Sequence, residues 1–333
     1  FSSGNAWIGD FSNIFMKSID LDSTSGTIPE SLFATFQMTF AIITPALIIG
    51  AFVERIKFSA MLIFISMWML IVYVPVTHWV WGGGILSSWG TMDFAGGIVV
   101  HATAGTAALI TALTLGKRRG FPKSITPPHS PILTMIGAAM LWVGWFGFNA
   151  GSALGANGGA GMAMLVTHIS ASMAALVWMF IEWKRFGKPS LIGVVTGMVA
   201  GLATVTPASG YIGIPGGLVL GFSGGVLCYL AVDFIRGKLL IDDSLDVFAV
   251  HGVGGILGTL LVAFLATSTF SGLGLPEGQT AMSQFVVQIK AIILTVIWTS
   301  IFTYLILKVT SLIVPLRVDE QEEIEGLDLR SHG

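Results

Sequence analysis

Charged residues are scarce in this sequence. Only 10% of its 333 residues are Asp, Glu, Lys or Arg, whereas 54% are hydrophobic. Soluble domains carry about 25% charged residues, so this balance excludes an ordinary water-soluble globular protein. Cysteine is equally rare: the single Cys228 lies in an apolar run. A disulfide framework and a thiolate metal site are therefore excluded as well.

Long apolar stretches recur from about residue 29 to residue 313. A helix needs about 20 apolar residues to cross a bilayer core of about 30 Å, and nine segments approach that length. They are residues 30–52, 59–81, 94–116, 131–150, 159–181, 191–206, 215–235, 247–267 and 284–312. The sequence predicts an all-α, polytopic membrane helical bundle over residues 29–313, with an extracellular or periplasmic lead-in segment (1–28) and a cytoplasmic C-terminal tail (314–333).

Most of the basic residues lie in alternate loops. All but two of the 16 lysines and arginines, Lys17 and Lys290, flank or follow the odd-numbered segments or lie in the tail. Loops on the cytoplasmic side of membrane proteins carry an excess of Lys and Arg. We therefore expect a multi-pass protein of the inner (plasma) membrane, with the N-terminus outside and the C-terminus in the cytoplasm.

An aspartate and a histidine open both the third and the eighth apolar segments. The third reads Asp93-x7-His101-x3-Gly, and the eighth reads Asp246-x4-His251-x3-Gly. The two segments enter from opposite faces, as an inverted repeat with a site near its midplane predicts. Ionisable groups inside a span usually face a cavity or the bundle interior, so the histidines either share a site or bond separately to helix carbonyls. For both aspartates a helix-capping role is favoured.

Aromatic residues form a second pattern. The residues concerned are Phe36, Phe40, Trp81, Trp145 and Phe148, with Ser152 on the same helix face as Phe148. Packing would explain each phenylalanine alone, and a belt position at the membrane interface would explain Trp81. Together, an indole, a phenyl ring and a hydroxyl would bind a small cation by cation–π attraction and a hydrogen bond. An intramembrane enzyme is disfavoured, because no nucleophile, metal-ligand spacing or carboxylate pair lies in the spans; we expect no cofactor and no nucleic-acid partner.

Six segments carry a resemblance to a known family. They read ERIKFSA, DFAGGIVVH, GWFGFNAGS, VTPASGYIG, DVFAVHGVGG and EGLDLRSHG. They resemble segments of the ammonium transporter, methylammonium permease and Rhesus protein family, on its bacterial ammonium transporter branch, from about Phe36 to Gly333. The resemblance implies a homotrimer with one narrow hydrophobic pore per subunit. Through it, ammonium and methylammonium would pass by outer recruitment, deprotonation and passage as ammonia.

The resemblance also implies roles for single residues at the outer end of the pore. Trp81, Phe40 and Ser152 match the recruitment site for ammonium, with Asp93 beside it in a structural role. Phe40 and Phe148 match the stacked phenyl gate below that site.

Deeper in the pore, His101 and His251 match the family's twin histidines. The tail resembles one that helps to dock a P-II type signalling protein at the cytoplasmic face. An ammonium sensor with little conduction is the alternative function, and the short acidic tail favours the transporter.

The family has eleven spans, with an inverted five-plus-five repeat. This chain starts where the third span would be approached, so we expect it to lack the first two helices. The repeat would then be incomplete at the N-terminus and the sequence would be a fragment.

Overall fold

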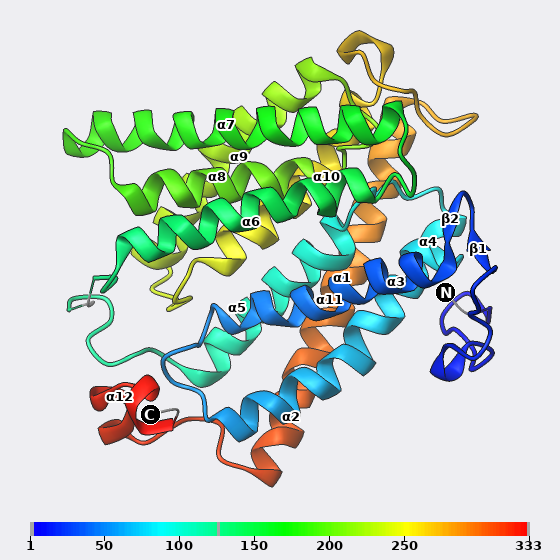
Figure 1. Ribbon diagram of the computed structural model, residues 1–333. Helices are drawn as coiled ribbons and strands as arrows, with labels where there is room; N and C mark the ends of the chain where they lie inside the picture. Colours follow the sequence, from blue (N-terminus) through cyan, green and yellow to red (C-terminus); the bar gives the residue numbers. More distant parts are fainter. Residues whose placement is uncertain (1–2, 125–126, 332–333) are drawn as a thin grey trace.

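The first half of the bundle contains α1, two further long helical stretches and one short helix (Figure 1). The computed structural model describes residues 3–124 and 127–331. In this half the helices are α1 (Glu30–Ile49), α2 (Phe58–Trp68) continued by the π-helix η2 (Met69–Tyr73) and α3 (Val74–Trp81), the short α4 (Ile85–Ser88), and the π-helix η3 (Gly97–Ala102) continued by α5 (Thr103–Leu115). Ahead of α1 lie the 3₁₀ turn η1 (Ile14–Met16) and a two-stranded antiparallel hairpin, β1 (Thr24–Ser25) and β2 (Ile28–Pro29).

The second half contains a closely packed group, α7, α8 and α9, with α6 and α10 against it. Its helices are α6 (Pro131–Gly151), α7 (Gly158–Phe186), α8 (Leu191–Val205), α9 (Ile214–Val232) continued by the π-helix η4 (Asp233–Lys238), and the π-helix η5 (Phe248–Gly252) continued by α10 (Val253–Leu265). After the 3₁₀ turn η6 (Ser268–Phe270), the long α11 (Ala281–Ile313) packs on both halves. The short α12 (Glu320–Glu325) and α13 (Leu327–Ser331) form the tail, whose last two residues lie outside the described part.

All nine predicted segments are helical, and the predicted membrane bundle is confirmed. Within the described ranges, eight helical stretches are long and apolar enough to cross a membrane. The ninth, α8, has only 15 residues. It ends just before Pro207, whose ring and missing N–H prevent a helix from continuing.

The two histidine-bearing stretches cross where each has a glycine. In the bundle η3 packs against α10 and η5 against α5, so the two stretches run antiparallel. A Cβ on Gly105 would lie 2.3 Å from the Cα of Gly252, and one on Gly255 would lie 2.6 Å from the Cβ of His101. Small residues permit such close approach of membrane helices. Because each glycine meets the histidine turn of the opposite stretch, the contact is reciprocal, as the predicted inverted repeat requires.

The aspartate that corresponds to Asp93 in the second half is Asp243, so the prediction of Asp246 was wrong. Asp243 precedes His251 at the same spacing at which Asp93 precedes His101. Its Oδ2 accepts a hydrogen bond of 2.7 Å from the backbone N–H of Phe248, the first residue of η5. Asp246 has a left-handed backbone (φ 56°), whereas a capping residue usually has a β-region backbone, and its carboxylate lies 3.1 Å from Arg236.

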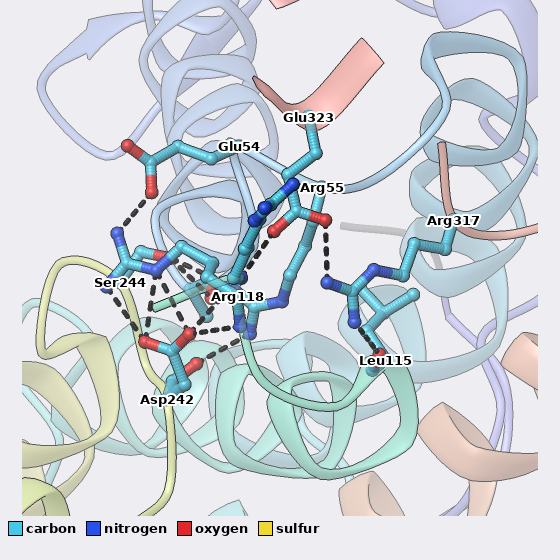
Figure 2. Close-up of polar contacts among 10 residues, drawn as sticks. Glu54, Arg55, Leu115, Arg118, Asp242, Ser244, Arg317 and Glu323 are labelled. Atoms are coloured by element: carbon cyan, nitrogen blue, oxygen red, sulfur yellow. Dashed lines mark hydrogen bonds and ion pairs between the residues drawn. The ribbon is translucent and has the colours of Figure 1, made fainter. Parts of the chain in front are cut away.

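A group of polar and charged side chains joins several loops at the end of the bundle where the C-terminus lies (Figures 1 and 2). We call it the arginine cluster; it consists of Glu54, Arg55, Arg118, Asp242, Ser244, Arg317 and Glu323. The fully buried Arg55 donates to the carbonyl of Asp242 at 2.6 Å and to the hydroxyl of Ser244 at 2.9 Å. Arg118 lies 2.8 Å from the Asp242 carboxylate and also pairs with Glu54. These contacts connect the loop after α1, the loop after α5 and the loop before η5.

The tail is held on the arginine cluster by both side chains and backbone. Arg317 donates to the carbonyl of Leu115 at 3.0 Å and to Glu323 at 2.7 Å. The backbone N–H of Val318 donates to the carbonyl of Arg55, and that of Lys57 donates to Leu316. The segment after α11 is thus fixed against the end of α5 and the loop after α1.

The glycine crossing predicts that Gly105→Ala destabilises the fold. The added methyl would meet backbone atoms of Gly252, which cannot move aside, so we expect a loss of about 1–3 kcal/mol. The readout is the melting temperature of the purified protein in detergent. Gly137→Ala on α6 is the matched control, because a Cβ there meets nothing within 4 Å. Equal melting temperatures for the two variants would contradict the close crossing.

The arginine cluster predicts an acid-sensitive contribution to stability. Burial raises the pKa of Asp242, but hydrogen bonds from Arg118 and the charges of Arg118 and Arg55 outweigh it and hold the pKa below its ordinary 3.8. With a depressed folded-state pKa, the stabilisation is present above pH 3.8 and is lost as the pH falls through the folded-state value.

Accordingly, Asp242→Asn should lower the melting temperature at pH 7, and the deficit should shrink as the pH falls below 3.8 and through the folded-state pKa of Asp242. Thermal unfolding in detergent across this pH range measures it, with the exposed tail residue Asp328 changed to Asn as the control. A deficit that does not change with pH would argue against the ionised pair.

Candidate functional site

Aromatic rings follow one another from the end of α3 to the histidines. The ring centroid of Trp81 lies 5.4 Å from that of Phe40, in an edge-to-face arrangement. Phe40 lies 4.4 Å from Phe148, and Phe148 lies 6.1 Å from the ring of His101. We call Trp81, Phe40, Phe148 and His101 the aromatic file. It joins α3, α1, α6 and η3, so residues far apart in sequence form one row.

The two histidines face each other inside the bundle. The Nδ1 atoms of His101 and His251 lie 3.2 Å apart, and both side chains are buried. In this contact one ring donates its Nδ1–H and the other accepts. The donor ring then presents a lone pair at Nε2 and the acceptor ring presents an N–H. Nε2 of His101 has no hydrogen-bond partner among the described residues, so it is free to meet a small polar molecule.

Trp145 is a member of the site that the sequence reasoning did not assign. Its ring stacks on His101 at 5.3 Å with an interplanar angle of 17°. Its indole N–H donates to the hydroxyl of Thr206 at 2.9 Å, which fixes the ring. The signal in the sequence was its position one turn before Phe148, on the same helix face.

A cavity reaches His101 from the groove between α1 and α6. Its volume is about 390 Å³. The lining is almost wholly apolar and includes Phe36, Leu141, Trp145 and Phe148, with His101 as its ionisable group. An environment of this kind disfavours a full charge and leaves a neutral, hydrogen-bonding guest as the species that fits best.

Asp93 stands at the start of the histidine-bearing stretch and caps it, as predicted. Its carboxylate accepts four backbone N–H groups, from Gly96, Gly97, Ile98 and Val99, at 2.6–3.1 Å. These N–H groups have no partner within the helix. The carbonyl of Asp93 accepts the indole N–H of Trp81 at 2.8 Å. One residue therefore anchors both ends of the aromatic file.

Ser152 ends α6 one turn after Phe148. Its hydroxyl donates to the carbonyl of Phe148 at 2.9 Å. With the hydrogen used in this way, the oxygen lone pairs remain to accept from a cationic donor.

Among residues 3–124 and 127–331, no group of three or more His, Cys, Asp or Glu side chains could hold a metal ion.

Replacing each of the three aspartates by alanine tests which of them cap helices. Asp93→Ala removes a charged acceptor from four N–H groups, so we expect a loss of about 3 kcal/mol or more, and a loss of about 1–2 kcal/mol for Asp243→Ala. Burial raises the pKa of Asp246 to about 7 against the lowering effect of Arg236, so its ion pair is only partly charged at neutral pH. Asp246→Ala should cost under about 1 kcal/mol.

The melting temperatures of the three purified variants rank these losses of stability. A larger effect of Asp246→Ala than of Asp243→Ala would reverse the assignment of the second cap.

Comparison with known proteins identifies the family. The sequence model of the Ammonium Transporter Family matches residues 1–333. The chain is similar to a putative ammonium transporter of Methanothermobacter thermautotrophicus, at 46% identity over all of this chain and 84% of the relative. It is also similar to an ammonium transporter of Aquifex aeolicus, at 46% identity over 97% of this chain and 75% of the relative.

Among solved structures, that of "Sensor Amt Protein" superposes with a TM-score of 0.89 at 30% identity. The superposition covers all of this chain and 84% of that one. The family match over the whole chain, the identity to its relatives and the shared helical bundle agree: the chain belongs to the Ammonium Transporter Family.

Proposed function

We propose that this chain conducts ammonium and methylammonium across the membrane along the aromatic file. The observation that carries the proposal is the unbroken row of rings that leads from Trp81 past Phe40 and Phe148 to the histidine pair. The names of the relatives support ammonium as the substrate.

The cation is recruited at the outer end of the row. Trp81 and Phe40 offer π faces, which attract a cation by about 0.5–2 kcal/mol each, and Ser152 offers an oxygen lone pair. Asp93 contributes by position rather than by charge, because its carboxylate is already satisfied by four backbone N–H groups.

Phe40 and Phe148 act as the gate, and deprotonation is the selective step. Ammonium and potassium have the same charge and similar size, so neither property separates them. Ammonium can release a proton and pass two phenyl rings as neutral ammonia, whereas potassium has no neutral form. Past the gate, His101 and His251 present one acceptor and one donor to ammonia, and imidazole can also relay a proton.

We propose three further features on the family resemblance. The protein is a homotrimer in the plasma membrane, with its N-terminus outside and the arginine cluster at the cytoplasmic end. The tail, held on that cluster by Arg317 and Glu323, offers a docking surface for a P-II type signalling protein.

A sensor that conducts little is the second candidate. The similarity to "Sensor Amt Protein" favours it, since the two bundles superpose over the whole of this chain. Uptake separates the two: a transporter accumulates substrate at a rate that saturates with concentration, and a sensor binds it without comparable flux.

Uptake of labelled methylammonium by the purified protein in liposomes tests the proposal. Trp81→Ala should raise KM about tenfold through loss of cation–π attraction, and His101→Ala should change the maximal rate and the selectivity over potassium. The matched controls are Trp183→Ala and His129→Ala, since both side chains are exposed. If Trp81→Ala and His101→Ala both behaved like the controls, the assigned pathway would be wrong; no uptake above empty liposomes would favour the sensor.

A further inference from the structure

Two glutamines are fully buried on α11, a helix that carries none of the residues in the aromatic file. Gln284 and Gln288 lie one turn apart, and neither side chain is exposed. A buried amide without partners costs free energy, yet a leucine of similar size would fill the same space at no such cost. Their contacts therefore indicate what they do.

Gln288 hydrogen-bonds to both backbone groups of Met92, the residue before Asp93, as a neighbouring peptide would. Its Oε1 accepts the N–H of Met92 at 2.9 Å, and its Nε2 donates to the carbonyl of Met92 at 2.7 Å. The same Nε2 donates to the carbonyl of Thr259 on α10 at 3.0 Å. Gln284 extends the contact, donating to the carbonyl of Gly90 at 2.9 Å and to Gln288. One side chain thus links α11, the segment before Asp93 and the helix that carries His251.

The residue after Met92 is the anchor of Trp81. The carbonyl that receives the Trp81 indole belongs to the Asp93–Phe94 peptide, and the N–H of that peptide donates to the carbonyl of Pro207 at 3.0 Å. Both polar groups of the Asp93–Phe94 peptide are therefore hydrogen-bonded. The carbonyl of the preceding Met92–Asp93 peptide accepts from Gln288. The Trp81 ring also packs edge-to-face against Phe40.

We propose that Gln288 is a positioning residue for cation recruitment. It holds Met92 and Asp93 in the register in which the Asp93 carbonyl meets the Trp81 indole, and so it sets the angle of the indole face toward Phe40. This inference rests on the proposed recruitment role of Trp81. Among the described residues, the hydrogen bonds of Gln288 go to Met92, Thr259 and Gln284 and not to the aromatic file or His251, so it acts through the Met92–Asp93 backbone.

Gln288→Leu keeps a side chain of similar size and removes the hydrogen bonds that Gln288 makes to Met92, Thr259 and Gln284. The N–H and carbonyl of Met92 and the carbonyl of Thr259 would then be buried without this partner, and the loop would shift to solvate them. For methylammonium uptake in liposomes we expect KM to rise about five- to tenfold, with the maximal rate per folded protein changed much less. Thr299→Val is the matched control: it is buried on the same helix, and its hydroxyl has no hydrogen-bond partner among the described residues.

A double-mutant cycle with Trp81→Ala separates positioning from general loosening of the bundle. If Gln288 acts through Trp81, Gln288→Leu should raise KM in the unchanged protein but add nothing in the Trp81→Ala background. An unchanged KM for Gln288→Leu, or the same increase in both backgrounds, would overturn the inference.

Trp81→Ala alone serves as the reference for the two proposals. If it raises KM and Gln288→Leu does not, only the positioning role is lost. If Trp81→Ala leaves KM unchanged, the recruitment role of Trp81 is lost, and the role of Gln288 is lost with it.

Discussion

The approach of two backbones at glycine is the constraint on which the rest of the molecule depends. Gly105 meets the turn of His251, and Gly255 meets the turn of His101, at distances where no side chain would fit. Lipid provides little hydrophobic force between helices, so close van der Waals packing has to hold them. The same approach brings the two Nδ1 atoms to 3.2 Å. The contact that packs the two halves of the bundle together is therefore also the contact that pairs His101 with His251.

Buried polar groups in this bundle are used to fix helix ends. The start of each histidine-bearing stretch is closed by an aspartate, Asp93 in the first half and Asp243 in the second. In a membrane no water is at hand to satisfy free N–H groups. The caps consequently allow each stretch to begin at a defined residue inside the protein. Because the histidine follows at the same spacing in both halves, the caps also set its depth.

The two ends of the bundle are organised by different interactions. The arginine cluster uses ion pairs and backbone bonds to join loops with the tail, and its Arg55 is wholly buried. At the opposite end, amide and indole groups bond to backbone carbonyls, through Gln288 and Trp81. The Asp93 carboxylate at that end is satisfied by four backbone N–H groups.

Much of this organisation follows from the sequence by itself. The lengths of the apolar runs predict the helices, because the thickness of a bilayer sets the minimum length of a spanning helix. The alternation of basic loops predicts the orientation of the chain in the membrane. The family resemblance indicated every ring of the aromatic file. The sequence also contains the Asp-x7-His spacing at Asp243, but Asp246 lies nearer to His251 and was predicted as the cap instead. Only the left-handed turn at Asp246 shows why that residue cannot cap.

Other features were decided by the tertiary structure alone. The stacking of Trp145 on His101, the bonds of Gln288 to Met92 and the burial of Arg55 join residues that no local pattern connects. Helix periodicity reports which face of a helix is apolar, but not which residue of another helix it meets. Those partners depend on how helices cross. Here the crossing is set by the glycines, whose effect appears only when two distant segments lie side by side.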